Sequence, residues 1–302
     1  MVQGAYEIFR EWTGLGSKMK IFQELINTSE LNDLLAVADC RLIDCRSDLM
    51  QPEKGRADYL AGHLPDAVFA DLDVDLADPI TSTSGRHPLP DVERFRRTLE
   101  NWGISNDTQV VAYDYANGAL AARLWWMLRW MGHERVAVLD GGIAAWIATG
   151  GEMQTTVPQF DKTVFNAMPK PGFVATTEEI AAALAAGTEL NLVDARDAAR
   201  FSGQTEPIDT VAGHVPGAIS YPLSRNLNED GTWRTAKELA SCWEEVLDGR
   251  PVAPLITMCG SGVTACHLVL SAQIAGLAEP RVYVGSWSEW IRDPARPIAT
   301  TG

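Results

Sequence analysis

The sequence is short of cysteine, and the cysteines it has are not paired by motif. There are five in 302 residues, an odd number with no Cys-x-x-Cys pair, which fits neither a disulfide framework nor a metal site of that spacing. These residues are Cys40, Cys45, Cys242, Cys259 and Cys266. Free thiols are typical of a reducing compartment, so we expect a cytoplasmic protein without a bound metal.

Positive charge and long apolar runs are scarce as well. The chain has 25 basic against 40 acidic residues and a formal net charge of −15, so its surface repels nucleic acids and anionic membranes. No run approaches the roughly 18 apolar residues of a membrane helix, and charges throughout the N-terminus distinguish it from a signal peptide. We therefore expect neither nucleic acid nor membrane as a partner. Met19 offers an internal start, which would leave residues 1–18 outside the fold.

What the sequence does contain is a repeat. "LIDCRSD" at 42–48 returns as "LVDARDA" at 192–198, "AGHLPDAV" at 61–68 returns as "AGHVPGAI" at 212–219, and "RVAVLDGGIAAW" from 135 matches "RVYVGSWSEW" from 281. Three matches in the same order predict a duplicated domain. A stretch rich in Gly, Pro and Thr separates the copies, so we expect an N-terminal domain at 20–150, a linker at 151–171 and a C-terminal domain at 172–302.

Within each copy, short apolar runs alternate with helical patterns. "RLIDCR", "QVVAYD" and "RVAVLDG" are typical of buried strands, while "DVERFRRTLENWG", "ALAARLWWMLRWMG" and "TTEEIAAALAAG" place apolar residues three to four apart. The alternation predicts two α/β domains, each a parallel sheet with helices on both faces. In such sheets, ligands bind at the loops that follow the carboxyl ends of strands.

One such loop, in "LITMCGSGVTAC", holds a cysteine. Cys259 follows a strand-like run, and Gly260 and Gly262 allow the next N–H groups to curl toward one point as an anion nest at the start of a helix. Such a nest stabilises a thiolate, the reactive form, although a single cysteine is also often a small buried apolar residue. Aligning the copies sets Tyr115 opposite Cys259 and Gly118 opposite Gly262, so only the second copy has a thiol in this loop.

Together these residues resemble the tandem-domain rhodanese family of sulfurtransferases. The resemblance rests on the Asp-x-Arg after the first main strand, on Gly-His-x-Pro in both copies and on the cysteine loop in the second, and it covers the chain from about Ile21 onward. It implies two rhodanese-like domains, of which the first is catalytically silent. "CGSGVT" is most similar to the 3-mercaptopyruvate branch, because the thiosulfate branch has basic residues just after the cysteine.

The resemblance also implies a covalent transfer of sulfur. Cys259 takes sulfur from a small anionic donor, 3-mercaptopyruvate, becomes a persulfide, and passes the sulfur to cyanide or to a thiol acceptor such as a thioredoxin-like protein. The backbone of Gly260, Gly262, Val263 and Thr264 binds the anionic persulfide. No metal or organic cofactor takes part.

Arg200 matches a position at which the family binds the anionic donor. A planar guanidinium suits a carboxylate because it can donate two parallel hydrogen bonds. The branch has a second donor-binding arginine after "TEP", but here Ile208, Asp209 and Thr210 follow instead. The resemblance therefore supplies only one of the two expected cations.

Ser261 matches a serine that the branch uses with a histidine and an acid of the first domain to relay a proton. We expect His63 to be that histidine, since imidazole titrates near neutral pH, and Asp58, nearby in the sequence, to be the acid. His214 repeats the motif of His63 in the second copy, so a structural role is the alternative for both histidines.

Three other functions are alternatives to sulfur transfer from mercaptopyruvate: a phosphatase, a thiosulfate sulfurtransferase and a non-catalytic module. A phosphatase of this fold needs a Cys-x5-Arg loop, and the sixth residue after Cys259 is Ala265, not arginine. Thiosulfate stays open as the donor because of the missing arginine, although a neutral loop with Arg200 suits a single carboxylate better. A non-catalytic sulfur carrier or binding module stays open if the Cys259 thiol is inaccessible.

Overall fold

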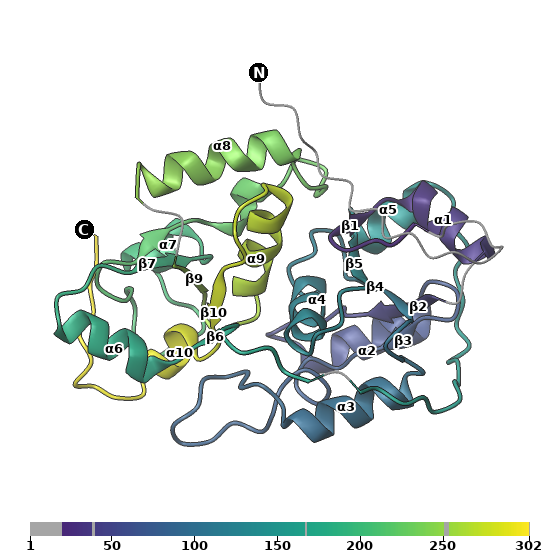
Figure 1. Ribbon diagram of the computed structural model, residues 1–302, viewed down its shortest axis with the longest axis horizontal. Helices are drawn as coiled ribbons and strands as arrows, with labels where there is room; N and C mark the ends of the chain where they lie inside the picture. Colours follow the sequence, from purple (N-terminus) through teal and green to yellow (C-terminus); the bar gives the residue numbers. More distant parts are fainter. Residues whose placement is uncertain (1–19, 38–39, 167, 251–253, 302) are drawn as a thin grey trace.

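The computed structural model describes residues 20–37, 40–166, 168–250 and 254–301. The prediction that residues 1–18 are not part of the fold concerns a segment outside these ranges. Two five-stranded sheets are present in this part of the chain, one from each half of the sequence (Figure 1). All strand pairs within them are parallel. The expectation of two α/β units with parallel sheets is confirmed.

The first sheet has the strand order β1-β5-β4-β2-β3. Its strands are β1 (Leu25–Ile26), β2 (Cys40–Asp44), β3 (Val68–Phe69), β4 (Gln109–Tyr113) and β5 (Val136–Leu139). The helices of this half are α1 (Thr28–Val37), α2 (Pro52–Ala61), α3 (Val92–Asn101), α4 (Ala121–Trp130) and α5 (Gly142–Ala148). The strands and helices expected in this half from apolar periodicity are present.

The second sheet has the equivalent order, β6-β10-β9-β7-β8. Its strands are β6 (Val174–Ala175), β7 (Asn191–Asp194), β8 (Ile219–Ser220), β9 (Leu255–Met258) and β10 (Arg281–Tyr283). Its helices are α6 (Thr177–Ala185), α7 (Ala198–Ser202), α8 (Ala236–Leu247), α9 (Ala265–Ile274) and α10 (Ser286–Trp290), with a 3-10 turn η1 (Leu223–Asn226). The shared strand order gives the sequence repeat its structural counterpart, and the expected linker lies between α5 and β6.

Alternation along the central strands places helices on both faces of each sheet. On β4, Val110 and Ala112 belong to a core shared with α3 and α4, whereas Val111 and Tyr113 belong to a core shared with α1 and α5. Side chains of successive strand residues point to opposite faces, so each face needs its own cover. In the second half, α8 and α9 cover one face and α6 and α10 the other.

The two halves share a continuous apolar core along α4 and α9. Nearly every side chain of α4, including Trp125 and Trp126, is buried, and α4 contacts α9 directly (Figure 1). A helix that is apolar on all sides must be covered on all sides, which explains why the apolar residues of "LWWMLRW" are not confined to one face of the helix. Among the helices of the described ranges, none combines the length and apolar character that a bilayer crossing requires.

Candidate active site

Cys259 is the first residue after β9, at the carboxyl edge of the second sheet. Its side chain is buried, and its Sγ accepts hydrogen bonds from the N–H groups of Ser261 (3.4 Å) and Gly262 (3.1 Å). Its own backbone is fixed by α10, through its N–H to Ser286 Oγ (3.1 Å) and the Trp287 N–H to its carbonyl (3.0 Å). Two amides aimed at the sulfur make this loop a site for an anionic sulfur species.

The loop needs glycine at one position in particular. Gly262 has φ +81°, and a β-carbon there would lie 2.3 Å from the carbonyl oxygen of Val284. An L side chain would therefore meet both backbone strain and a clash. The other predicted loop residues, Gly260, Val263 and Thr264, lie in the same turn between Cys259 and α9.

A chain of three polar side chains leads from this loop to the first half. Ser261 Oγ lies 2.7 Å from Nδ1 of His87, and His87 Nε2 lies 3.3 Å from Oδ1 of Asp73. Since the carboxylate of Asp73 accepts, Nε2 carries the proton and Nδ1 accepts from the Ser261 hydroxyl. Burial lowers the pKa of His87, while the hydrogen bond from His87 lowers the pKa of Asp73. The imidazole is therefore neutral at pH 7 and able to take up a proton.

The structure places His63 elsewhere. Its Nδ1 lies 2.8 Å from the carbonyl oxygen of Tyr59, and its ring stacks on that tyrosine. His214 makes the equivalent contacts with Phe201 in the second half. A histidine that recurs with the same backbone contact fixes a loop, so the prediction that His63 is the relay histidine is wrong.

Asp58 does not belong to the relay either. Its carboxylate accepts a hydrogen bond from the Tyr115 hydroxyl (2.7 Å) and forms an ion pair with Lys54, which is the main cause of its lowered pKa. These contacts lie at the corresponding loop of the first half. The acid that faces the relay histidine is Asp73, and the prediction of Asp58 is wrong because proximity in sequence did not reflect proximity to Cys259.

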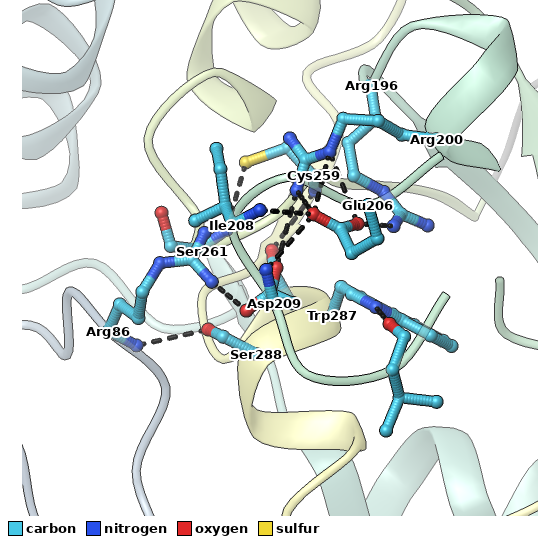
Figure 2. A network of polar contacts seen from close by, with 12 residues as sticks. Arg86, Arg196, Arg200, Glu206, Ile208, Asp209, Cys259, Ser261, Trp287 and Ser288 are labelled. Atoms are coloured by element: carbon cyan, nitrogen blue, oxygen red, sulfur yellow. Dashed lines mark hydrogen bonds and ion pairs between the residues drawn. The ribbon is translucent and has the colours of Figure 1, made fainter. Parts of the chain in front are cut away.

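The predicted donor-binding residue, Arg200, lies beside Cys259 in a network of ion pairs (Figure 2). Its Nη2 lies 2.7 Å from Glu206 and 3.3 Å from Asp209, and Asp209 also pairs with Arg86 from the first half. Arg196 binds Asp194, the last residue of β7, as its counterpart Arg46 binds Asp44, and it also pairs with Glu206 of this network (3.4 Å). The network therefore holds one arginine, Arg86, that the sequence interpretation did not include.

A buried cation lies behind the cysteine loop. Arg123 of α4 is fully buried and donates to the carbonyl oxygens of Gly262 (3.0 Å), Leu76 (3.2 Å) and His87 (3.1 Å). Among the residues that the structure describes, no carboxylate lies within ion-pair distance of this guanidinium. Arg123 thus joins the segment that carries His87 to the cysteine loop and adds a fixed positive charge there.

The equivalent loop of the first half holds a carboxylate where the second half holds the thiol. Asp114, not Tyr115, corresponds to Cys259. The Asp114 carbonyl accepts a hydrogen bond from the Ile143 N–H, and the Cys259 carbonyl accepts the equivalent bond from the Trp287 N–H. The buried Asp114 side chain accepts four hydrogen bonds of 2.9 to 3.2 Å from the N–H groups of Ala116, Gly118, Leu120 and Ala121. The predicted alignment was off by one because this loop has an extra residue before its positive-φ glycine.

Three residues that sequence reasoning missed, Asp73, Arg86 and His87, come from the loop between β3 and α3. This loop reaches beneath the second half (Figure 1), where the Arg86 N–H donates to Ser288 Oγ (3.0 Å). The available signal was "GRHP", whose histidine has no counterpart in the second copy, in contrast to the repeated His63. In the described part of the chain, no three His, Cys, Asp or Glu side chains are grouped as metal ligands would be.

Comparison with known proteins agrees with the repeat. Residues 27–149 and 176–293 each match the family model of a rhodanese-like domain. The chain is 42% identical over 279 residues to a protein of Pseudomonas aeruginosa named "Probable 3-mercaptopyruvate sulfurtransferase", covering 92% of this chain and 98% of that protein. It is 34% identical over 244 residues to the thiosulfate sulfurtransferase of Rattus norvegicus, covering 79% and 80%. The solved 3-mercaptopyruvate sulfurtransferase from Leishmania major superposes with a TM-score of 0.79 at 30% identity, covering 89% of this chain and 74% of that one.

Proposed function

Since the chain belongs to the rhodanese-like family and is a sulfurtransferase, we propose that it transfers the sulfur of 3-mercaptopyruvate through a persulfide on Cys259. The observation that carries this proposal is the pairing of two groups in one loop. The Cys259 sulfur accepts hydrogen bonds from two backbone N–H groups. Ser261, two residues further along the chain, is hydrogen-bonded to His87. A nucleophile and a proton relay are thus adjacent.

In the first step, the Cys259 thiolate attacks the thiol sulfur of the donor. The carbon–sulfur bond breaks, its electron pair stays on carbon as the enolate of pyruvate, and the sulfur remains on Cys259 as a persulfide. The proton of the donor thiol finally resides on that carbon, giving pyruvate. Ser261 and His87 hold and move this proton, because the neutral imidazole accepts from the serine hydroxyl and Asp73 stabilises its charged form.

In the second step, cyanide or a thiolate attacks the outer sulfur of the persulfide. The sulfur–sulfur bond breaks, the acceptor becomes thiocyanate or a persulfide, and the Cys259 thiolate is restored. The N–H groups of Ser261 and Gly262 bind the inner sulfur, and those of Gly260, Val263 and Thr264 are proposed donors to the outer one. A cysteine-containing, thioredoxin-like protein fits as a thiol acceptor.

The charges next to the loop favour a donor with a single carboxylate. Three arginines pair with three carboxylates there: Arg86, Arg196 and Arg200 with Asp194, Glu206 and Asp209. Figure 2 shows the three arginines around Glu206 and Asp209. A network without net charge accommodates the monoanion of mercaptopyruvate better than the dianion thiosulfate. Arg200 supplies the bidentate group that a carboxylate prefers.

The two halves have different roles in this proposal. Residues 172–302 form the catalytic domain, whereas residues 20–150 form a silent domain that supplies His87 and Asp73, with 151–171 as the linker. Asp114 in the loop of the silent domain supports this assignment, because a carboxylate occupies its amide nest. The five free cysteines support a place in the reducing cytoplasm.

Turnover of the purified protein with 3-mercaptopyruvate and, separately, with thiosulfate tests the proposal, with cyanide as acceptor. We expect preferred turnover of mercaptopyruvate and none above background in Cys259→Ser. Cys266→Ser is the matched control, since Cys266 is a buried core thiol on α9. Turnover retained in Cys259→Ser would refute the mechanism, and a preference for thiosulfate would refute the donor.

A further inference from the structure

Arg86 and Arg200 come from different halves of the chain and meet at one carboxylate. Asp209 Oδ1 pairs with Arg86 Nη1, and Asp209 Oδ2 lies 3.3 Å from Arg200 Nη2. Figure 2 shows the Asp209 side chain between the two guanidinium groups. The aspartate side chain is 5% exposed, so this contact is largely shielded from water.

Both guanidinium groups lie against the residue that follows the nucleophile. A β-carbon built on Gly260 would be 2.9 Å from Arg86 Nη2 and 3.4 Å from Arg200 Nη2. The two cations therefore lie directly beside the Cys259 loop. A larger residue at position 260 would contact both of them.

Building on the proposed function, we propose that Arg86 and Arg200 form a donor-carboxylate clamp that Asp209 occupies until the donor displaces it. The carboxylate of the sulfur donor takes the place of the Asp209 side chain between the two arginines. Asp209 thereby competes with the donor and sets its affinity. Because one carboxylate replaces another, the net charge between the two arginines stays the same when a monoanionic donor displaces the Asp209 side chain.

The guanidinium of Arg200 is held by contacts that do not depend on Asp209, and Arg86 is anchored through its backbone. Arg200 donates from Nε and Nη2 to Glu206, at 3.1 and 2.7 Å, and the backbone of Arg86 is fixed on Ser288 Oγ. Burial raises the pKa of Asp209 and the Glu206 carboxylate adds to this effect, while Arg86, Arg200 and Arg196 act to lower this pKa. The Arg200 guanidinium is thus pre-positioned by Glu206, while the charged form of Asp209 is held less firmly than its arginine contacts alone would hold it.

The clamp also accounts for the missing arginine. The related enzymes were expected to have a second donor-binding arginine on the loop after "TEP", but this chain has Asp209 in that loop. An acidic residue there would repel an anionic donor unless another cation compensated for it. Arg86, contributed by the first half, is that cation, so the clamp exists only when the two halves are docked.

Alkylation of Cys259 tests the clamp without reference to the natural donor. Iodoacetate carries a carboxylate and iodoacetamide does not, so the ratio of their rate constants at Cys259, measured by peptide mapping, reports on the clamp. We expect Arg86→Met to lower this ratio about 10-fold, the loss of one charge-assisted contact, and Asp209→Asn to raise it several-fold. Iodoacetamide rates should not change, which shows that the loop is still folded.

Donor kinetics provide the second measurement. Asp209→Asn should lower the KM for 3-mercaptopyruvate by about 3- to 10-fold, since a site occupied by its own aspartate loses apparent affinity in proportion to that occupancy. Arg86→Met should raise the KM about 10-fold or more. Glu279→Gln is the matched control, because it removes a carboxylate from another ion pair between the halves, with Arg129, away from the loop.

Each outcome separates the clamp from the proposed function. A higher KM and a lower alkylation ratio in Asp209→Asn would overturn the clamp, because Asp209 would then be a fixed support of the arginines. Unchanged ratios in Arg86→Met would overturn it too. If the ratios change as expected but wild-type protein does not turn over mercaptopyruvate, the donor assignment fails and the clamp stands.

Discussion

His87 and His63 are both buried histidines of the first half, and they differ in what their ring nitrogens contact. His63 faces backbone carbonyls, which neither gain nor lose a proton. His87 faces the hydroxyl of Ser261 and the carboxylate of Asp73, which can pass a proton along the line. At the residue scale, a role in catalysis therefore follows from the contacts of the ring and not from the motif in which a histidine lies.

Replacing His87 should remove the relay while leaving the nucleophile in place. We expect His87→Gln to lower kcat for 3-mercaptopyruvate by about 10²- to 10⁴-fold, the usual contribution of general acid–base catalysis. Alkylation of Cys259 by iodoacetamide should change little. His63→Gln, the matched control, should affect stability but not the pH profile.

The pH profile of the wild-type enzyme should show the same residue. Burial lowers the pKa of His87 from its ordinary 6.5, so the imidazole stays neutral to lower pH and only then loses its ability to accept from Ser261. We expect kcat/KM to fall on the acid side with a midpoint below 6.5, and that limb to be absent in His87→Gln. An identical acid limb in the variant would contradict this role.

At the scale of structural elements, the loops after β4 and β9 have the same backbone arrangement but a different side chain at its centre. Both follow a central strand and lead into a helix of the domain interface, and in both, backbone N–H groups converge on one point. In the first loop the Asp114 carboxylate fills that point, and in the second the Cys259 sulfur does. The loop of the first half is therefore a structural site that the protein's own carboxylate fills.

Asp114→Ala should accordingly destabilise the protein without affecting chemistry. It leaves the amides of a largely half-buried loop without their acceptor, so we expect the free energy of unfolding to fall by about 2–4 kcal/mol in urea titrations. The kcat of the folded variant should match wild type, since Asp114 does not contact the cysteine loop. Asp107→Ala, at an exposed turn, is the control that should change little. Wild-type stability with a reduced kcat would contradict this view.

At the scale of the whole molecule, each half completes the loop of the other. The first half extends Asp73, Arg86 and His87 to the cysteine loop. The second half extends Trp233, whose backbone N–H donates to Asp140 (2.9 Å) and whose ring lies against Gly118 in the Asp114 loop. Neither loop is complete in one domain. Docking of the two halves is therefore part of building the proposed active site.

These contributions from one half to the other explain which features the sequence predicts and which it does not. Periodicity and the repeat predicted the sheets, and the small-residue loop after a strand predicted Cys259, because these are local properties of the chain. His87 and Arg86 reach the site only through docking, and no local pattern encodes which loop of one half meets which loop of the other. Comparing the copies would have helped, since His63 is repeated whereas His87 is not.

Buried histidines should make the docked molecule sensitive to acid. Burial lowers the pKa of His267, at the interface, to about 3 and that of His133 to about 4. Both are depressed below the unfolded value near 6.5, so below that pH the unfolded chain binds more protons and stability falls as pH falls. The limiting slope is about 1.4 kcal/mol per pH unit for each histidine.

His267→Gln isolates the interface contribution to this slope. In the folded protein His267 Nε2 donates to the carbonyl of Asn117 (3.1 Å) and Nδ1 faces the Asn226 amide (3.2 Å), so a second proton has no acceptor. We expect the stability of the variant to depend less steeply on pH between about 6.5 and 5, as measured by urea unfolding. Equal slopes in variant and wild type would show that His267 does not limit acid stability.

The central claim is that Cys259 carries the transferred sulfur, and mass spectrometry of the intact protein tests it most directly. After incubation with 3-mercaptopyruvate without an acceptor, we expect the mass to rise by one sulfur atom, located to the peptide of Cys259 and removed by cyanide. Cys259→Ser should gain nothing, and Cys266→Ser should behave as wild type. A sulfur adduct on another cysteine, or turnover without any adduct, would contradict the account.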